Sequence, residues 1–179
     1  MEIVNNKCAT FFGGGKNDRN SIEYAETVLI GKLLAENDYR INTCGYFGLM
    51  EAVSKGGLEA GGTTIGMLCD EVHKTSPGNN YLKHHIRSRN ICSRLHLLTD
   101  DVDVFVVQKG SVGTLAEIMV VINIITLRKD FHKKMYIIGP MWKQLIGEIY
   151  KTLEIDYEFI IFCEDYKDFE TKFFENTVK

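Results

Sequence analysis

A short glycine-containing loop carries the groups most able to do chemistry in this chain. It reads Lys109-Gly110-Ser111-Val112-Gly113-Thr114, and it joins a valine-rich run to a stretch with helical character. Glycines let the backbone approach a ligand closely, and the first turn of a helix presents free N–H groups and a partial positive charge. We therefore expect the loop to hold a phosphate. The alternative is a glycine turn that only connects a strand to a helix.

Glu117 follows Thr114 by three residues, near the start of the same expected helix. A carboxylate beside a phosphate loop can stabilise positive charge on a sugar or activate a water molecule. The pattern Thr114-x-x-Glu117 also has the spacing of a capping box, in which the two side chains only close the start of a helix. From the residues alone both roles stay open.

Other common site patterns are missing from the sequence. The 109–114 loop lacks the G-K-[ST] ending of a Walker A loop, and neither it nor the glycine run 13–15 fits the G-x-G-x-x-G dinucleotide fingerprint. Five scattered cysteines without a C-x-x-C pair indicate reduced, mostly buried thiols, although Cys44 or Cys69 at a strand end could be a nucleophile. His84, His85 and His96 could suggest a metal, but they are expected to be surface or helix-filling residues. We expect no metal and no cofactor.

Strand-like apolar runs alternate with helix-like stretches along the chain. Asn20 and Glu23 predict a capping box before the first helix. The expected strands are Cys8–Phe12, Tyr39–Cys44, Thr63–Leu68, Asp103–Gln108, Lys134–Gly139 and Tyr157–Cys163. The expected helices are Ile22–Glu36, Leu49–Ala60, Tyr81–Leu98, Thr114–Leu127, Met141–Leu153 and Tyr166–Glu175.

This alternation predicts the α/β class, with a doubly wound parallel sheet of six or seven strands and helices on both faces. Residues 1–179 are expected to form a single Rossmann-like domain. Ligands of such sheets bind at the carboxyl ends of the strands, where the strand order reverses. The strand-to-helix loops 13–20, 43–48, 69–80 and 108–114 are therefore the places to look for a site.

The composition argues against several classes of partner. The net charge is −3 and the pI is near 6.0, so the chain has no general attraction to nucleic acid or to an anionic membrane. No signal peptide and no apolar run of membrane-spanning length is found. We expect a cytoplasmic protein that binds neither nucleic acid nor membrane.

Two stretches, GLMEAVSKGGLEAGGTTIGML (48–68) and DVFVVQKGSVGTLAEI (103–118), resemble the LOG family, whose signature is P-G-G-x-G-T-x-x-E. The run M-E-A-V-S-K-G is similar to the branch related to molybdenum cofactor carrier proteins. The similarity extends from about Cys8 to Leu127. It implies a Rossmann-like homodimer that hydrolyses the N-glycosidic bond of a nucleoside 5′-monophosphate, giving free base and ribose 5-phosphate.

The resemblance also assigns roles to residues. Glu117 becomes the catalytic carboxylate, and its partner is an arginine one helix earlier. Arg94, nine residues before Asp103, is the first choice, and Arg89 in an R-N pair is the second. The ligand-binding residues that it implies are Gly13, Gly14, Gly45, Gly48, Leu49, Met50, Arg89, Lys109, Gly110, Ser111, Val112, Gly113 and Thr114.

The chain departs from the family pattern at two glycine clusters. Lys109-Gly110-Ser111 replaces P-G-G, and Tyr46 and Phe47 are bulky where the family has small residues. These changes support an alternative function, a non-catalytic carrier or sensor of a nucleotide or pterin derivative. Lysine decarboxylation is excluded because no lysine is set apart to hold pyridoxal phosphate. The expected partners are a small nucleotide ligand and a second copy of the chain.

Overall fold

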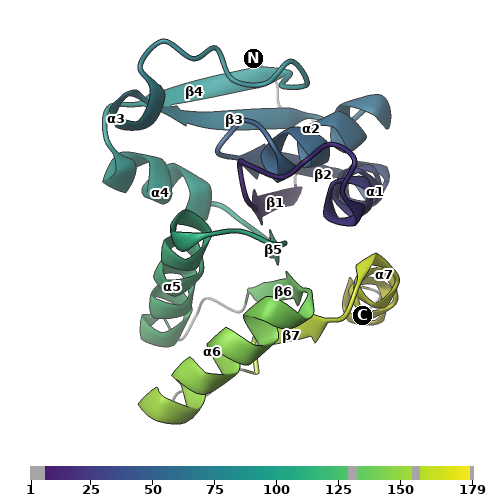
Figure 1. The fold of residues 1–179 in the computed structure, drawn as a ribbon, viewed down its shortest axis with the longest axis vertical. Coiled ribbons are helices and arrows are strands. Elements are labelled where there is room, and N and C mark those ends of the chain that lie inside the picture. Colours follow the sequence, from purple (N-terminus) through teal and green to yellow (C-terminus); the bar gives the residue numbers. More distant parts are fainter. Residues whose placement is uncertain (1–6, 129–132, 155–157, 178–179) are drawn as a thin grey trace.

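The fold is built on one parallel sheet whose strand order is β4-β3-β2-β1-β5-β6-β7 (Figure 1). The structure is a computed structural model that describes residues 7–128, 133–154 and 158–177. The prediction of a doubly wound sheet is confirmed, with seven strands. They are β1 (Lys7–Phe12), β2 (Tyr39–Thr43), β3 (Thr64–Cys69), β4 (His84–Ser88), β5 (Val104–Val107), β6 (Lys134–Ile138) and β7 (Ile160–Cys163).

Helices cover both faces of the sheet, as each crossover between parallel strands requires. Helices α4, α5 and α6 pack on one face, and α1, α2 and α7 pack on the other (Figure 1). The helices are α1 (Ile22–Glu36), α2 (Leu49–Glu59), α3 (Asp70–His73), α4 (Ile91–Thr99), α5 (Val112–Leu127), α6 (Pro140–Leu153) and α7 (Tyr166–Thr177).

The central strands are apolar on both sides because both sides are buried. In β1, Cys8 and Phe12 join the core beneath α4–α6, whereas Ala9 and Phe11 join the core beneath α1, α2 and α7. All four side chains are at most 1% exposed. Such strands read as continuous apolar runs in the sequence, which is why the central strands were predictable.

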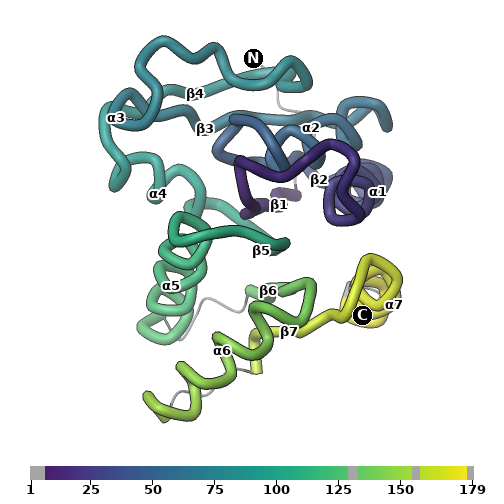
Figure 2. Tube along the Cα trace, viewed as in Figure 1, coloured from purple at the N-terminus to yellow at the C-terminus, as the bar shows by residue number. Residues whose placement is uncertain are grey.

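Helices α1 and α2 touch through their backbones at glycines, and they lie side by side in the trace (Figure 2). A Cβ added at Gly56 would lie 1.9 Å from the carbonyl oxygen of Val28. One added at Gly31 would lie 2.2 Å from the carbonyl oxygen of Val53. The two helices therefore form one closely fitted layer over β1 and β2.

The predicted helix Tyr81–Leu98 is wrong in its first half. Residues His84–Ser88 form β4, which pairs in parallel with β3 at the edge of the sheet, and helix α4 begins only at Ile91. Only Ser88 of this strand is buried. An edge strand needs no continuous apolar run, so its charged and histidine residues read like a solvated helix face.

Two helix starts also differ from the prediction. The cap of α1 is Ser21, whose Oγ accepts a hydrogen bond from the backbone N of Tyr24 at 3.2 Å, and not Asn20. Helix α5 begins at Val112, two residues earlier than expected, with Ser111 at its N-cap position. The short helix α3 occupies part of the segment expected to be a loop.

The strand order reverses between β1 and β5, and the loops that follow these two strands meet there. The backbone N of Gly14 donates to the carbonyl oxygen of Lys109 at 2.9 Å. The backbone N of Leu49 donates to the carbonyl oxygen of Gly14, also at 2.9 Å, which brings the start of α2 to the same point. Within the described ranges, no helix is long and apolar enough to cross a membrane.

Candidate functional site

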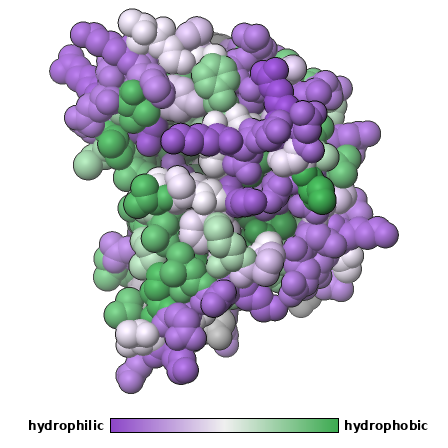
Figure 3. Space-filling view, in the orientation of Figure 1, coloured by the Kyte–Doolittle hydropathy of each residue, from purple (hydrophilic) through white to green (hydrophobic). Residues whose placement is uncertain are grey.

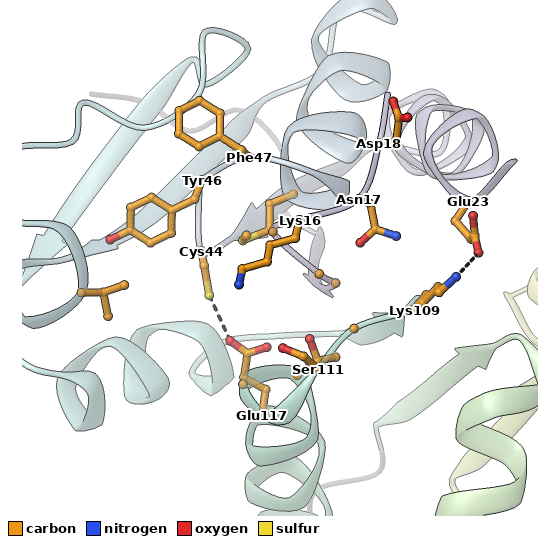
Figure 4. Close-up of a pocket in the computed structure, with 18 of the residues that line it drawn as sticks. Lys16, Asn17, Asp18, Glu23, Cys44, Tyr46, Phe47, Lys109, Ser111 and Glu117 are labelled. Atoms are coloured by element: carbon orange, nitrogen blue, oxygen red, sulfur yellow. Dashed lines mark hydrogen bonds and ion pairs between the residues drawn. The ribbon is translucent and has the colours of Figure 1, made fainter. Parts of the chain in front are cut away.

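A cavity of about 760 Å³ opens at this reversal of strand order, between the loops that follow β1, β2 and β5 (Figure 4). Residues of α1, α2, α3 and α4 and the start of α5 form the rest of its wall. The sequence-predicted residues that line it are Gly13, Gly14, Met50, Arg94, Lys109, Gly110, Ser111, Gly113, Thr114 and Glu117. The fold therefore brings most of the predicted site residues to one place.

The first backbone N–H groups of α5 have no partner within the helix, and Ser111, Gly113 and Thr114 of this turn line the cavity. Ser111 occupies the N-cap position, but its side chain makes no capping hydrogen bond, so its hydroxyl can turn to a ligand. A Cβ at Gly110 would lie 2.2 Å from Oγ1 of Thr114, and hence only glycine fits beside that buried threonine. Free N–H groups and the positive end of a helix make an anion site.

Glu117 lies one turn further along α5, and its side chain faces the cavity (Figure 4). It is 7% exposed, and its Oε1 accepts a hydrogen bond from Sγ of Cys44 at 3.0 Å. Burial raises the pKa of Glu117, while the hydrogen bond from Cys44 and the charge of Arg94 lower it. The net effect is a pKa above the ordinary value, which makes the carboxylate a stronger base than an exposed one.

The capping-box interpretation of Glu117 is wrong. Since Ser111 is the N-cap, the third residue of the helix is Thr114, and Glu117 lies beyond the first turn. A capping box needs its acidic residue at the third position, where the side chain can reach back to the cap. The side chain of Glu117 is instead held by the thiol of Cys44 from the end of β2.

Cys44 acts as a hydrogen-bond donor in this arrangement. Burial, followed by the nearby charge of Glu117, raises the pKa of Cys44 well above its ordinary value. A thiol of that kind stays protonated and is a poor nucleophile. Cys8, Cys69 and Cys163 are also free and buried, as expected, whereas Cys92 is free and exposed.

The geometry separates the two candidate arginines. Arg94 reaches the cavity from α4, and its charge lowers the pKa of both Glu117 and Cys44. Its Nε is buried and has no hydrogen-bond partner among the described residues. Arg89 is exposed on the turn before α4 and does not line the cavity. The structure therefore favours Arg94 as the arginine of the site.

The bulky residues of the β2–α2 loop leave the cavity open. The hydroxyl of Tyr46 donates to the carbonyl oxygen of Cys69 at 3.2 Å and accepts from the backbone N of Cys69 at 2.9 Å, which ties the ring to the end of β3. Phe47 is 56% exposed and lies at the rim (Figure 4). Neither side chain closes the space above Glu117.

Four other predicted binding residues do not line the cavity. Gly48, with φ of 65°, starts α2, and a Cβ there would lie 2.5 Å from the carbonyl oxygen of Gly14. Gly45, with φ of 79°, packs against the backbone of Gly66. Leu49 is buried in the core, and Val112 is 80% exposed. Gly45, Gly48 and Leu49 shape the loops instead of facing a ligand.

The sequence motifs missed several lining residues, five of them in the polar stretch between β1 and α1. Lys16 points from this stretch into the cavity (Figure 4). Lys109 lies at the other side of the cavity, where its Nζ forms an ion pair with Oε1 of Glu23 at 2.7 Å. The missed residues are Gly15, Lys16, Asn17, Asp18, Ser21, Glu23, Cys44, Tyr46, Phe47, Val72 and His73. The expectation that strand-to-helix loops carry the site was the signal that pointed to most of them.

Metal binding finds no support at this site. Among the described residues, no three histidine, cysteine, aspartate or glutamate side chains are grouped so as to hold a metal ion. The donors that face the cavity are instead backbone N–H groups, hydroxyls and cationic side chains, which suit an anionic ligand.

Several solved structures share this fold. The molybdenum cofactor binding protein from the phototrophic bacterium Rippkaea orientalis aligns with a TM-score of 0.76 at 16% identity, over 98% of this chain and 99% of that chain. The molybdenum cofactor carrier protein from Chlamydomonas reinhardtii aligns with a TM-score of 0.76 at 20% identity, over 97% of this chain and 99% of that chain. DNA processing protein A from Helicobacter pylori aligns with a TM-score of 0.62 at 11% identity, over 97% of this chain and 83% of that chain.

A comparison with curated protein sequences gives no match. The model of the SLOG cluster4 family, in contrast, matches residues 7–146. This range includes the glycine loop, Glu117, Arg94 and all the strands from β1 to β6. The match agrees with the resemblance to the LOG family, and because it extends over most of the chain, the protein belongs to the SLOG cluster4 family.

Proposed function

We propose that the protein binds a nucleoside 5′-monophosphate in this cavity and hydrolyses its N-glycosidic bond. The observation that carries the proposal is the position of Glu117, a buried carboxylate that faces the cavity one turn beyond the open start of α5. An anion site and a basic carboxylate on consecutive turns of one helix suit a substrate with a phosphate at one end and a reacting sugar beside it.

The phosphate is assigned to the first turn of α5. The backbone N–H groups of residues 112–114 are the orphan donors of that helix, and Ser111 and Lys109 add a hydroxyl and an ammonium group nearby. Lys109 is 53% exposed, so its pairing with Glu23 is weak and can be exchanged for a phosphate. Fixing the phosphate orients the ribose toward Glu117.

The reaction breaks the bond between the sugar carbon C1′ and the base nitrogen. The bonding electrons leave with the base, which takes up a proton, and the oxygen of a water molecule bonds to C1′. Glu117 stabilises the positive charge that develops on the sugar and accepts the proton of the attacking water. Arg94, with a buried Nε that has no partner among the described residues, binds the hydroxyls or phosphate of the substrate.

Incubation of the purified protein with AMP, GMP, CMP and UMP, and with the matching nucleosides, tests this function. We expect free base and ribose 5-phosphate from at least one monophosphate and no release from the nucleosides, which lack the phosphate. Binding of a monophosphate without release of base would contradict the hydrolase proposal.

A second candidate function is binding without turnover. The observation in its favour is the thiol of Cys44, which already occupies one acceptor position on Oε1 of Glu117. Two structures with the same fold are named as a molybdenum cofactor binding protein and a molybdenum cofactor carrier protein. In native mass spectrometry, a phosphorylated pterin or nucleotide that stays bound intact would favour this candidate.

The pH dependence of hydrolysis is a further prediction. Activity needs ionised Glu117, whose pKa is raised by burial and lowered by the hydrogen bond from Cys44. Cys44→Ala removes that donor, so the pKa of Glu117 rises and the acid limb of the kcat/KM profile moves to higher pH. Cys44→Ser keeps a donor and should leave the limb near its wild-type position. An unchanged limb in Cys44→Ala would show that the thiol does not tune the carboxylate.

We also propose that a second copy of the chain covers α5 and α6. Helix α5 is apolar on most sides, and hydrophobic side chains gather on the surface over these helices (Figure 3). Leu127 is 73% exposed and Leu145 is 41% exposed. Native mass spectrometry should give the mass of two chains, and the double variant Leu127→Glu, Leu145→Glu should give that of one. A wild-type monomer would contradict the proposal.

A further inference from the structure

We propose that a second cavity beside the first binds the heterocycle of a two-part ligand, in which a nucleoside 5′-monophosphate is joined through its phosphate to a second unit carrying a guanine- or pterin-type ring. This inference rests on the proposed phosphate site and defines the class of ligand that the site accepts. It follows from the position of the second cavity, its charge and the hydrogen bonds that hold one of its carboxylates.

The second cavity has a volume of about 600 Å³ and lies over the other half of the sheet. The start of α1, the residues that follow β5 and β7, and the β6–α6 connection form its wall. Ser21, Glu23 and Lys109 line both cavities. In doubly wound sheets, two-part nucleotides lie across the reversal of strand order, with one half over each side. The two cavities have that arrangement.

The ion pair between Lys109 and Glu23 stands at the boundary between the two cavities (Figure 4). The side chains are 53% and 29% exposed, so water screens the pair and separation costs little. A phosphate bound at the start of α5 would draw Lys109 away from Glu23. The second unit of the ligand can then pass between the separated side chains of Lys109 and Glu23 into the second cavity.

The charge of the second cavity differs from that of the first. Its lining holds three carboxylates, those of Glu23, Glu26 and Glu164. Glu23 pairs with Lys109 at 2.7 Å and Glu164 with Lys143 at 2.8 Å. Glu26, in contrast, accepts from neutral donors, so the excess negative charge lies at Glu26. A second phosphate is therefore unfavourable there, whereas a group rich in N–H donors is favoured. The cavity also has an apolar side, to which Ile138, Met141 and Trp142 contribute.

The apolar side of the cavity is exposed at Met141, which is 42% exposed, whereas the ring of Trp142 is largely buried and its polar atom is already used. Its Nε1 donates to the carbonyl oxygen of Gln108 at 3.0 Å, and the side chain is 2% exposed. A flat ring can lie against this side of the cavity without competing for that hydrogen bond. The lining thus combines an apolar surface with a carboxylate edge, which is the arrangement that a flat aminated heterocycle needs.

Glu26 is the carboxylate held in place at this cavity. Its Oε2 accepts from Nε2 of Gln108 at 3.2 Å, and its Oε1 accepts from the backbone N of Tyr166 at 3.3 Å. Two acceptor positions remain, because a carboxylate has about four. Guanine and pterin present two adjacent N–H donors that match a carboxylate, whereas adenine presents a donor beside an acceptor. The pairing therefore selects a heterocycle with an amino group next to a ring N–H, as in guanine and pterin.

Isothermal titration calorimetry with three probes tests the inference: GMP, diguanosine diphosphate and diadenosine diphosphate. We expect diguanosine diphosphate to bind at least about tenfold more tightly than GMP, and more tightly than the diadenosine compound. GMP binding without any gain from the second guanosine would overturn the second subsite alone. Failure of all three probes to bind would overturn the phosphate site and this inference with it.

The variant Glu26→Gln places the effect on one side chain. In this variant, diguanosine diphosphate should bind no more than about threefold more tightly than GMP. The affinity for GMP itself should be unchanged, which also shows that the variant is folded. The matched control is Glu36→Gln, on the same helix and outside both cavities, where Glu36 pairs only loosely with Lys32 at 3.8 Å. An unchanged advantage in Glu26→Gln, or equal affinity for the two dinucleotides, would overturn the role of Glu26.

Discussion

Glu117→Gln is expected to lower kcat for nucleoside monophosphate hydrolysis by about 10²- to 10⁴-fold, the range associated with loss of a positioned acid or base. The amide has nearly the same size and can still accept the hydrogen bond from Cys44, which spans 3.0 Å to Oε1 in the wild type. It has no charge to stabilise a cationic sugar and no basicity toward water. Affinity for the monophosphate should change far less than kcat, because the phosphate is bound at the first turn of α5.

Steady-state release of ribose 5-phosphate, together with calorimetric binding of the same monophosphate, measures both effects. Asp18→Asn is the control, since Asp18 is an exposed carboxylate that lines the same cavity and its Oδ1 acceptor is retained. It should turn over at nearly the wild-type rate. Wild-type kcat in Glu117→Gln would mean that this carboxylate takes no part in chemistry.

Gly56→Ala is expected to lower the free energy of unfolding by about 1–3 kcal/mol or more, as overpacking of a closely fitted interior does. The added Cβ would lie 1.9 Å from the carbonyl oxygen of Val28 on the neighbouring helix. A backbone atom cannot rotate out of the way like the end of a side chain. Helices α1 and α2 would therefore have to move apart and lose contacts along their whole interface.

Gly147→Ala is the matched control, because Gly147 is also inside a helix but has open space where its Cβ would be. It should raise the free energy of unfolding by about 0.5–1 kcal/mol through the better helix propensity of alanine. Urea unfolding followed by circular dichroism compares the two variants. Equal stability of Gly56→Ala and the wild type would show that α1 and α2 are not in backbone contact.

The sheet was largely predictable because its central strands are buried on both faces. That burial forces runs such as Val104–Val107 to be apolar throughout, and such runs are visible in the sequence. The edge strand His84–Ser88 has no such requirement, and charged residues on the same stretch read as a helix. The start of α5 was misplaced because Thr114 and Glu117 mimic a capping box while Ser111 occupies the cap.

From the residues alone, the site was predictable only where one continuous segment carries it, whereas Gly13, Gly14, Met50 and Arg94 were named through the family resemblance. The glycine loop and Glu117 lie on a single strand–loop–helix unit, so their spacing alone indicates an anion site with a carboxylate nearby. Cys44 reaches Glu117 across 73 positions of the chain, and Lys16 approaches from a third segment. Such meetings depend on the order of strands in the sheet, which a single sequence does not reveal.

The glycine contacts between α1 and α2 also bear on how the cavities adapt to ligands of different size. Both helices contribute walls, α1 through Ser21 and Glu23 and α2 through Met50. Since the two backbones already touch, neither helix can move back by itself. This side of the binding region is therefore a rigid wall. A bulkier ligand must then be accommodated at the first turn of α5, where a Cβ added at Gly113 would meet no atom within 4 Å.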